Sequence, residues 1–228
     1  MVIPLYDHDP TDFKVLPYVT WSLIALNVIV FLVEQVSGGG EFLMMSYGAV
    51  PAAIVGQAQN ASPIPAWATL VTSMFLHNGW LHVGANMLYL FIFGDDIEDA
   101  LGWWRFLLFY MASGILAGLA YVGGNPGNVG PMVGASGAIA GVLAAYLMLR
   151  PCAKIWVFMF YRPVKIAAMW AIGVWVVMQF FDIASGEDDG VAYAAHFGGL
   201  AAGALLFFLL RPKDIELFEC IEEEPTPP

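Results

Sequence analysis

Charged residues are scarce in this sequence. Asp, Glu, Lys and Arg make up 12% of the 228 residues, hydrophobic residues make up 60%, and the mean hydropathy is +0.72. A soluble domain carries roughly 25% charged and about 45–50% apolar residues. One water-soluble core of this size cannot hide so much apolar surface. The composition therefore excludes an ordinary soluble domain and predicts a protein whose surface faces lipid.

Basic residues are the rarest charged residues. The chain has 8 Lys and Arg against 19 Asp and Glu, and its net charge is −11. It contains no basic stripe, so a nucleic-acid partner is excluded. The acidic residues gather at the ends and in one loop, as at 7–12, 187–189 and 216–224, where they keep the protein solvated.

Cysteine is almost absent too. Cys152 and Cys220 are the two cysteines of the chain, and two residues make no disulfide framework. The topology derived below places both on the cytoplasmic side, where thiols are expected to stay reduced. Acidic residues and prolines precede the first apolar run, which predicts a retained helix and not a cleaved signal peptide.

Long apolar runs are what the chain has instead. A helix needs roughly 20 apolar residues to cross a bilayer, and six segments meet or approach this length. They are 20–36, 81–94, 104–123, 136–149, 164–181 and 191–210. The sequence predicts an all-α protein with six transmembrane helices, a short central fourth helix and a long first loop at the membrane interface. Its expected parts are a cytoplasmic segment, 1–19, a membrane domain, 20–211, and a disordered acidic cytoplasmic tail, 212–228.

The basic residues predict the orientation. With six helices, all 8 Lys and Arg fall at the two termini, in the second-to-third loop or in the fourth-to-fifth loop. These parts share one side of the membrane, and cytoplasmic loops carry the excess of Lys and Arg. We therefore expect cytoplasmic termini, and the compact form suggests a bacterial inner membrane.

Three of the expected helices carry polar residues at a similar depth. His82 and Asn86 share one face of the second helix, Ser136 opens the fourth, and His196 lies in the sixth. Ser136 and His196 stand 14 and 15 residues before the next basic residue, which corresponds to about 21 and 22 Å of helix. The fourth helix is too short to cross and follows the Gly- and Pro-rich residues 125–133. Ser136 is therefore expected at the floor of a cavity open to the outer side.

This set of residues can support nucleophilic catalysis. A serine needs a histidine to take its proton, and the resulting oxyanion needs fixed hydrogen-bond donors. Ser136 and His196 would form a dyad, with Asn86, His82 and the Ser136 backbone N–H as donors. No acidic residue lies in a helix near His196, which favours a dyad over a triad.

Each of these residues also has another interpretation when taken alone. His196 could relay protons or bind a ligand, and His82 with Asn86 could simply bond a neighbouring helix. A metal site made of His77, His82 and His196 would lack a carboxylate or thiol beside them, so a metal ion is not expected there.

Small residues indicate how the fourth and sixth helices could meet. Gly137 and Gly141 are four residues apart, as are Gly199 and Gly203, and such pairs allow close backbone approach. Gly134, two residues before Ser136, completes the expected packing positions.

Taken together, these motifs resemble those of the rhomboid family of intramembrane serine proteases, in its minimal six-span bacterial type. The resemblance covers about residues 21–210. Its motifs are His77-Asn78 with His82-x-x-x-Asn86, Gly134-Ala135-Ser136-Gly137, Ala195-His196-x-x-Gly199-x-x-x-Gly203, and Glu98-x-x-x-Gly102-x-x-Arg105.

The resemblance implies hydrolysis of peptide bonds in or near the transmembrane helices of substrate proteins, without a cofactor. By position, Ser136 would be the nucleophile and His196 the general base. Asn86 and His82 would form the oxyanion hole.

Two positions depart from the family pattern. Trp67 is not followed by the arginine that many family members have. Ala140 stands where some members have an aromatic residue one turn after the serine, so Tyr193 or Phe197 is expected to support the His196 ring instead.

Two other functions remain open. A catalytically silent rhomboid-like protein would bind or escort membrane clients, but such relatives typically lack the serine or the histidine, and this chain has both. A small transporter would be expected to repeat its first half in its second, and the sequence has no such repeat.

Overall fold

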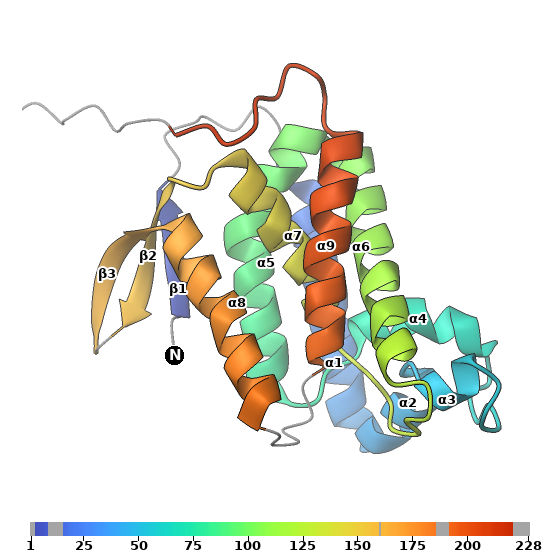
Figure 1. Ribbon diagram of the computed structural model, residues 1–228. Coiled ribbons are helices and arrows are strands. Elements are labelled where there is room, and N and C mark those ends of the chain that lie inside the picture. The colour runs from blue at the N-terminus through green and yellow to red at the C-terminus, as the bar shows by residue number, and fades with distance from the viewer. Residues whose placement is uncertain (1–2, 9–15, 160, 186–191, 221–228) are drawn as a thin grey trace, which may run out of the picture.

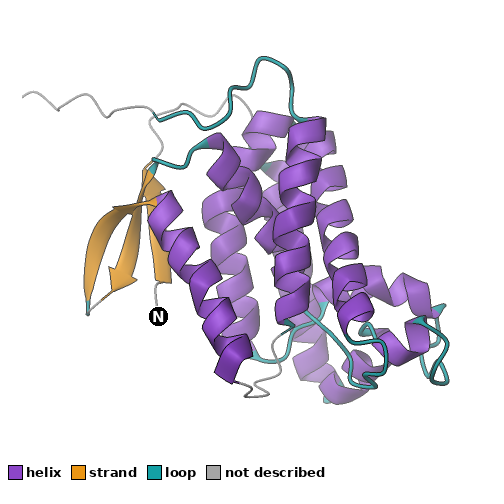
Figure 2. Ribbon diagram, in the orientation of Figure 1, coloured by secondary structure: helices purple, strands orange, loops and turns teal. Residues whose placement is uncertain are grey.

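The computed structural model describes residues 3–8, 16–159, 161–185 and 192–220. Most of this part of the chain is helical, and the long helices form one bundle (Figures 1 and 2). The long helices are α1 (Tyr18–Ser37), α5 (Trp80–Leu101), α6 (Trp103–Gly124), α7 (Ser136–Leu149), α8 (Ala168–Ser185) and α9 (Tyr193–Leu210). By length and composition, α1, α6 and α9 could each cross a membrane, and α7 and the segment Ala168–Phe181 are shorter apolar helices.

Helix α7 lies at the centre of the bundle. It is apolar all round, as expected for a helix that other helices cover on every side. Its buried residues run from Gly137 to Tyr146 without interruption and include Leu149. Helices α5, α6, α8 and α9 pack around it. Helix α7, which begins at Ser136, therefore lies within the bundle.

Helix α5 extends about two turns beyond the apolar segment predicted for it. The added residues, 95–101, include acidic side chains, and the two buried ones, Asp96 and Glu98, have partners. Glu98 accepts hydrogen bonds from the backbone N–H groups of Val19 and Thr20, at 2.9 and 2.7 Å, and from the Thr20 hydroxyl at 2.8 Å. Asp96 pairs with Arg150 at 3.4 Å. Glu98 thus satisfies free N–H groups at the start of α1 and ties that helix to α5.

The long first loop contains short helices. These are α2 (Gly40–Tyr47), α3 (Pro51–Ile54), η1 (Ala66–Ala68), α4 (Thr69–Thr72) and η2 (Ser73–Phe75). Helices α3 and α4 pack against α6 (Figure 1). The loop then returns to the bundle, where the Ser73 carbonyl accepts a hydrogen bond from the Gly134 N–H at 2.8 Å.

A three-stranded antiparallel sheet corrects the all-α prediction. Its order is β1-β2-β3, with β1 (Ile3–His8), β2 (Lys154–Met159) and β3 (Arg162–Ala167), and it lies beside α8 (Figure 2). β3 includes the first residues of the expected fifth helix, 164–167. In β2, Ile155 and Val157 are buried while Trp156 and Phe158 face outward. Because both faces of the strand carry apolar side chains, the period-two pattern of a strand is hidden in the sequence.

The C-terminal segment also departs from the prediction. Residues 212–220 were expected to be disordered, but the N–H groups of Phe218 and Glu219 donate to the carbonyls of Met148 and Leu149, at 2.7 and 3.3 Å. These bonds satisfy carbonyls in the last turn of α7. Residues 221–228 of the expected tail lie outside the described residues.

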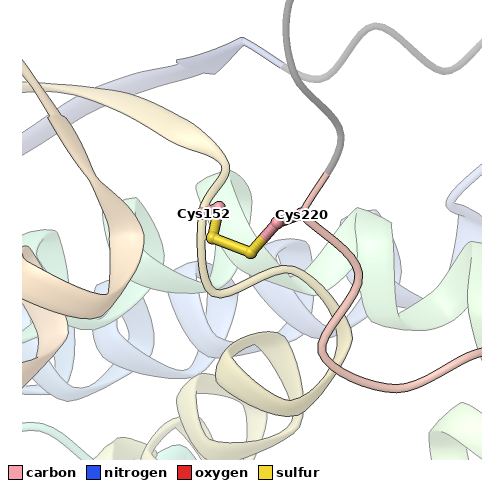
Figure 3. The surroundings of a disulfide bond; sticks show 2 residues. All are labelled: Cys152 and Cys220. Atoms are coloured by element: carbon pink, nitrogen blue, oxygen red, sulfur yellow. A yellow bond between two sulfur atoms is a disulfide. The ribbon is translucent and has the colours of Figure 1, made fainter.

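The structure departs from the expectation of two reduced thiols. Cys152 and Cys220 form a disulfide, with Cα atoms 5.1 Å apart, although 68 positions separate them in the sequence (Figure 3). The docked C-terminal segment brings Cys220 to the loop after α7, a contact that no local sequence pattern predicts.

Candidate active site

Ser136 and His196 lie side by side, 60 positions apart in the sequence. The Ser136 hydroxyl is 2.8 Å from Nε2 of His196. Ser136 is the first residue of α7, and His196 lies in the first turn of α9. The histidine is 7% exposed, while the serine is half-buried. A serine–histidine hydrogen bond of this kind is the geometry needed for a base to activate a nucleophile.

Glycines allow α7 and α9 to approach this closely. A side chain at Gly199 would collide with the carbonyl of Gly137, and one at Gly203 would collide with the backbone of Gly141. On its other side, Gly137 meets Ala117 of α6, where an added Cβ would lie 2.6 Å from the alanine Cβ. The α7 and α9 backbones are therefore in direct contact, which brings His196 within reach of Ser136.

Replacing Gly199 with alanine is expected to separate these helices. The new methyl group would overlap the Gly137 carbonyl, so we expect a loss of about 1–3 kcal/mol in the free energy of unfolding. Thermal unfolding in detergent would measure the loss. Gly173→Ala is the matched control, because a Cβ at Gly173 in α8 has no neighbour within 4 Å. Equal effects of the two substitutions would contradict the packing argument.

Gly134 allows residues of α5 to lie close to the Ser136–His196 pair. Its φ of +121° is a conformation that favours glycine. A Cβ there would lie 2.8 Å from the His82 ring and 3.7 Å from Nδ2 of Asn86. His82 and Asn86 therefore line the loop two residues before Ser136. Gly134 is a position of close approach between this loop and α5, in addition to the helix-packing role expected for it.

The side chains of α5 are oriented as hydrogen-bond donors. The Asn78 N–H donates to Nδ1 of His82 at 3.3 Å, which leaves the proton of the neutral ring on Nε2, toward Gly134. His77 packs edge-on against this ring, with centroids 5.1 Å apart. Asn86 is 6% exposed, and its Nδ2 has no hydrogen-bond partner among the described residues. A buried donor without a partner lowers the stability of the fold by about 1–3 kcal/mol. A role in binding a reacting group would explain why the protein keeps such a donor at this position.

The far side of the His196 ring contacts α8. Nδ1 lies 2.9 Å from Oε1 of Gln179, and the Trp175 ring is 5.6 Å from the imidazole. Tyr193, one of the two supports expected from the sequence, packs edge-on at 6.3 Å. Phe197, the other, packs instead against Phe180 at 4.5 Å.

Sequence reasoning missed Gln179, although a signal was present. It is the one polar residue in the apolar run 168–181, and buried polar residues in such runs usually have a partner.

The structure shows no metal site among the described residues: no group of three His, Cys, Asp or Glu side chains is close enough to hold a metal ion.

The fold and this site define a helical membrane protein with a serine–histidine pair at the start of a short central helix. A family model described as a Rhomboid domain matches residues 65–213, which is more than half of the chain. The protein therefore belongs to the rhomboid family, and the family predicted from its motifs is confirmed.

Several curated relatives are named as rhomboid proteins. The chain is 32% identical over 215 residues to Rhomboid protein 1, mitochondrial, of Saccharomyces cerevisiae, covering 88% of this chain and 56% of that protein. It is 34% identical over 133 residues to the rhomboid protease GluP of Bacillus subtilis, covering 58% and 24%. It is 32% identical over 147 residues to the putative rhomboid protease YdcA of the same organism, covering 64% and 69%. The chain thus spans 56% of the length of the yeast protein and 24% of the length of GluP.

Proposed function

We propose that this protein is an intramembrane serine endopeptidase that hydrolyses peptide bonds in or near transmembrane helices of substrate proteins. The observation that carries the proposal is the 2.8 Å contact between Ser136 Oγ and His196 Nε2. Membership of a family whose relatives include named proteases supports it. The test is cleavage of a model transmembrane substrate by the reconstituted protein, with Ser136→Ala beside it.

The proposed reaction begins with transfer of the serine proton to Nε2 of His196. The Ser136 oxygen attacks the carbonyl carbon of the scissile peptide and forms a tetrahedral oxyanion. His196 then gives its proton to the leaving amine, which departs and leaves an acyl group on the serine. A water molecule, activated by the same histidine, hydrolyses the acyl group and regenerates the serine.

The oxyanion would be bound by donors from two elements. Nδ2 of Asn86 and the Nε2–H of His82 come from α5. The Ser136 N–H belongs to the first residue of α7, where it has no partner within the helix. Donors that are already oriented before the reaction stabilise the developing charge without having to reorganise.

We further infer that α1, α5, α6, α7, α8 and α9 are six membrane-spanning elements, and that residues 20–211 form the protease domain. The bilayer and the helices of substrate proteins would then be its partners. The distribution of basic residues supports cytoplasmic termini, residues 1–19 and 212–228, with the active site open to the outer side. A bacterial inner membrane is the location we propose.

This orientation makes a prediction about Cys152 and Cys220, which lie at the proposed cytoplasmic end. Cytosolic reductants keep thiols reduced, so we expect the pair to be open in growing cells and closed in purified protein under air. Trapping thiols with a permeant maleimide during lysis, followed by mass analysis, should find both cysteines alkylated. Protection of both in cells would place this end on the oxidising side and reverse the proposed orientation.

A further inference from the structure

Gln179 is a buried polar residue in an apolar helix. It is 7% exposed, and its neighbours in α8 are Met178 and Phe180. Burying an amide in apolar surroundings is costly unless it forms hydrogen bonds. Its Oε1 lies 2.9 Å from Nδ1 of His196, on the side of the ring opposite Ser136. The helix thus buries a polar group at the point where it meets the histidine.

The hydrogen bonds at the two ring nitrogens of His196 are linked, because the nitrogen that accepts at one side requires the other nitrogen to donate. The Ser136 hydroxyl can donate to Nε2 only when that nitrogen carries no proton, so the proton of the neutral ring must be on Nδ1. An amide oxygen at 2.9 Å is an acceptor for that Nδ1–H. If the Gln179 amide presented its NH₂ group instead, the ring would hold its proton on Nε2 and could not act as the base.

We propose that Gln179 is the positioning residue for His196: its Oε1 accepts the Nδ1–H and holds the ring in the tautomer and orientation that activate Ser136. This inference rests on the proposed protease function. Gln179 then does the work that a carboxylate does in a serine–histidine–aspartate triad, with a neutral group in an apolar environment.

Other contacts of α8 hold the same ring in place. Trp175 precedes Gln179 by one helical turn, so both side chains share a face of α8, and the tryptophan ring is 5.6 Å from His196. Phe180 follows Gln179 in α8, and Phe197 follows His196 in α9. Their ring centroids are 4.5 Å apart, and this contact joins the two helices. The imidazole is thus held at its Nδ1 edge by Gln179 and packed beside Trp175, while α9 carries its backbone.

The bond to Gln179 should matter most during the reaction. When His196 takes the serine proton it becomes a cation, and its Nδ1–H···O bond becomes charge-assisted and stronger. The interaction is therefore stronger in the transition state than in the substrate complex, and losing it should lower kcat with little change in KM.

The experiment compares three substitutions in the full chain, reconstituted with a model transmembrane substrate. Gln179→Leu removes the acceptor and keeps similar bulk, Gln179→Glu keeps an acceptor oxygen, and Met178→Leu is a control on the exposed face of α8. Gln179→Leu should lower kcat about 10- to 100-fold, the effect of losing one hydrogen bond to a charged group, with KM within about twofold. Gln179→Glu should stay within about threefold of the wild type, and Met178→Leu should match it.

The outcomes separate a positioning role from simple packing. A lower kcat in Gln179→Leu, a kcat near that of the wild type in Gln179→Glu, and unchanged thermal stability in both would support the inference. Equal losses in both variants, or wild-type kcat in Gln179→Leu, would overturn it. Wild-type cleavage by Ser136→Ala would instead refute the proposed function, and this inference with it.

Discussion

Replacing Ser136 with alanine is expected to abolish cleavage of a transmembrane substrate. Without the hydroxyl 2.8 Å from His196, no acyl group can form on the protein. In the proposed mechanism the serine and the histidine act as a unit, so His196→Ala should cost about as much as Ser136→Ala, and the double variant should be no worse than either. In a comparable catalytic unit such losses reach about 10⁶-fold in kcat. Cleavage would be followed by gel or by fluorescence release from a reconstituted substrate.

The matched control for this prediction is Ser113→Ala. Ser113 is a fully buried serine in α6. Its loss should leave cleavage near the wild-type rate, which would show that removal of a buried hydroxyl alone does not inactivate the protein. Substrate binding without cleavage by the wild type would favour the silent, client-binding alternative.

Replacing Asn86 with alanine is expected to lower kcat by about 10²–10³-fold, the effect of removing one oxyanion donor. The Asn86 Nδ2 group is buried and has no partner among the described residues, so the substitution breaks no bond there in the resting protein. It should therefore leave thermal stability close to that of the wild type. Because the oxyanion exists only along the reaction, KM should change little.

Asn27→Ala controls for loss of a buried amide. Asn27 lies in α1, is fully buried, and donates to the Leu23 carbonyl of its own helix at 2.8 Å. Its removal should leave kcat unchanged. If Asn86→Ala raised KM and left kcat intact, Asn86 would bind substrate in its ground state and would not be an oxyanion donor.

The short central helix was predictable because its limits are local. A Gly- and Pro-rich stretch precedes Ser136, and Arg150-Pro151 follows Leu149, so the expected segment 136–149 and the observed α7 have the same bounds. Depth along a helix is also a local quantity, since each residue adds a fixed rise. Counting residues therefore assigned Ser136 and His196 to one level, and the structure has them in contact.

Lateral neighbours were harder to predict, because hydropathy does not say which helix lies beside which. Nothing local identifies α8 as the helix that reaches Nδ1 of His196, and so Gln179 was missed in favour of Tyr193 and Phe197. The disulfide depends on the same kind of information, because only the docking of residues 212–220 brings Cys220 to Cys152. The sheet was missed for another reason: Trp156 and Phe158 place apolar side chains on the outer face of β2 as well as on its inner face.

Labelling with a serine-reactive fluorophosphonate tests the central claim most directly, because it reports the activated serine without a known substrate. We expect one label per chain, located by mass spectrometry at Ser136 and lost in His196→Ala, since the histidine activates the serine through the 2.8 Å contact. Label on another serine, or labelling of Ser136 at the same rate in His196→Ala, would contradict the proposed dyad.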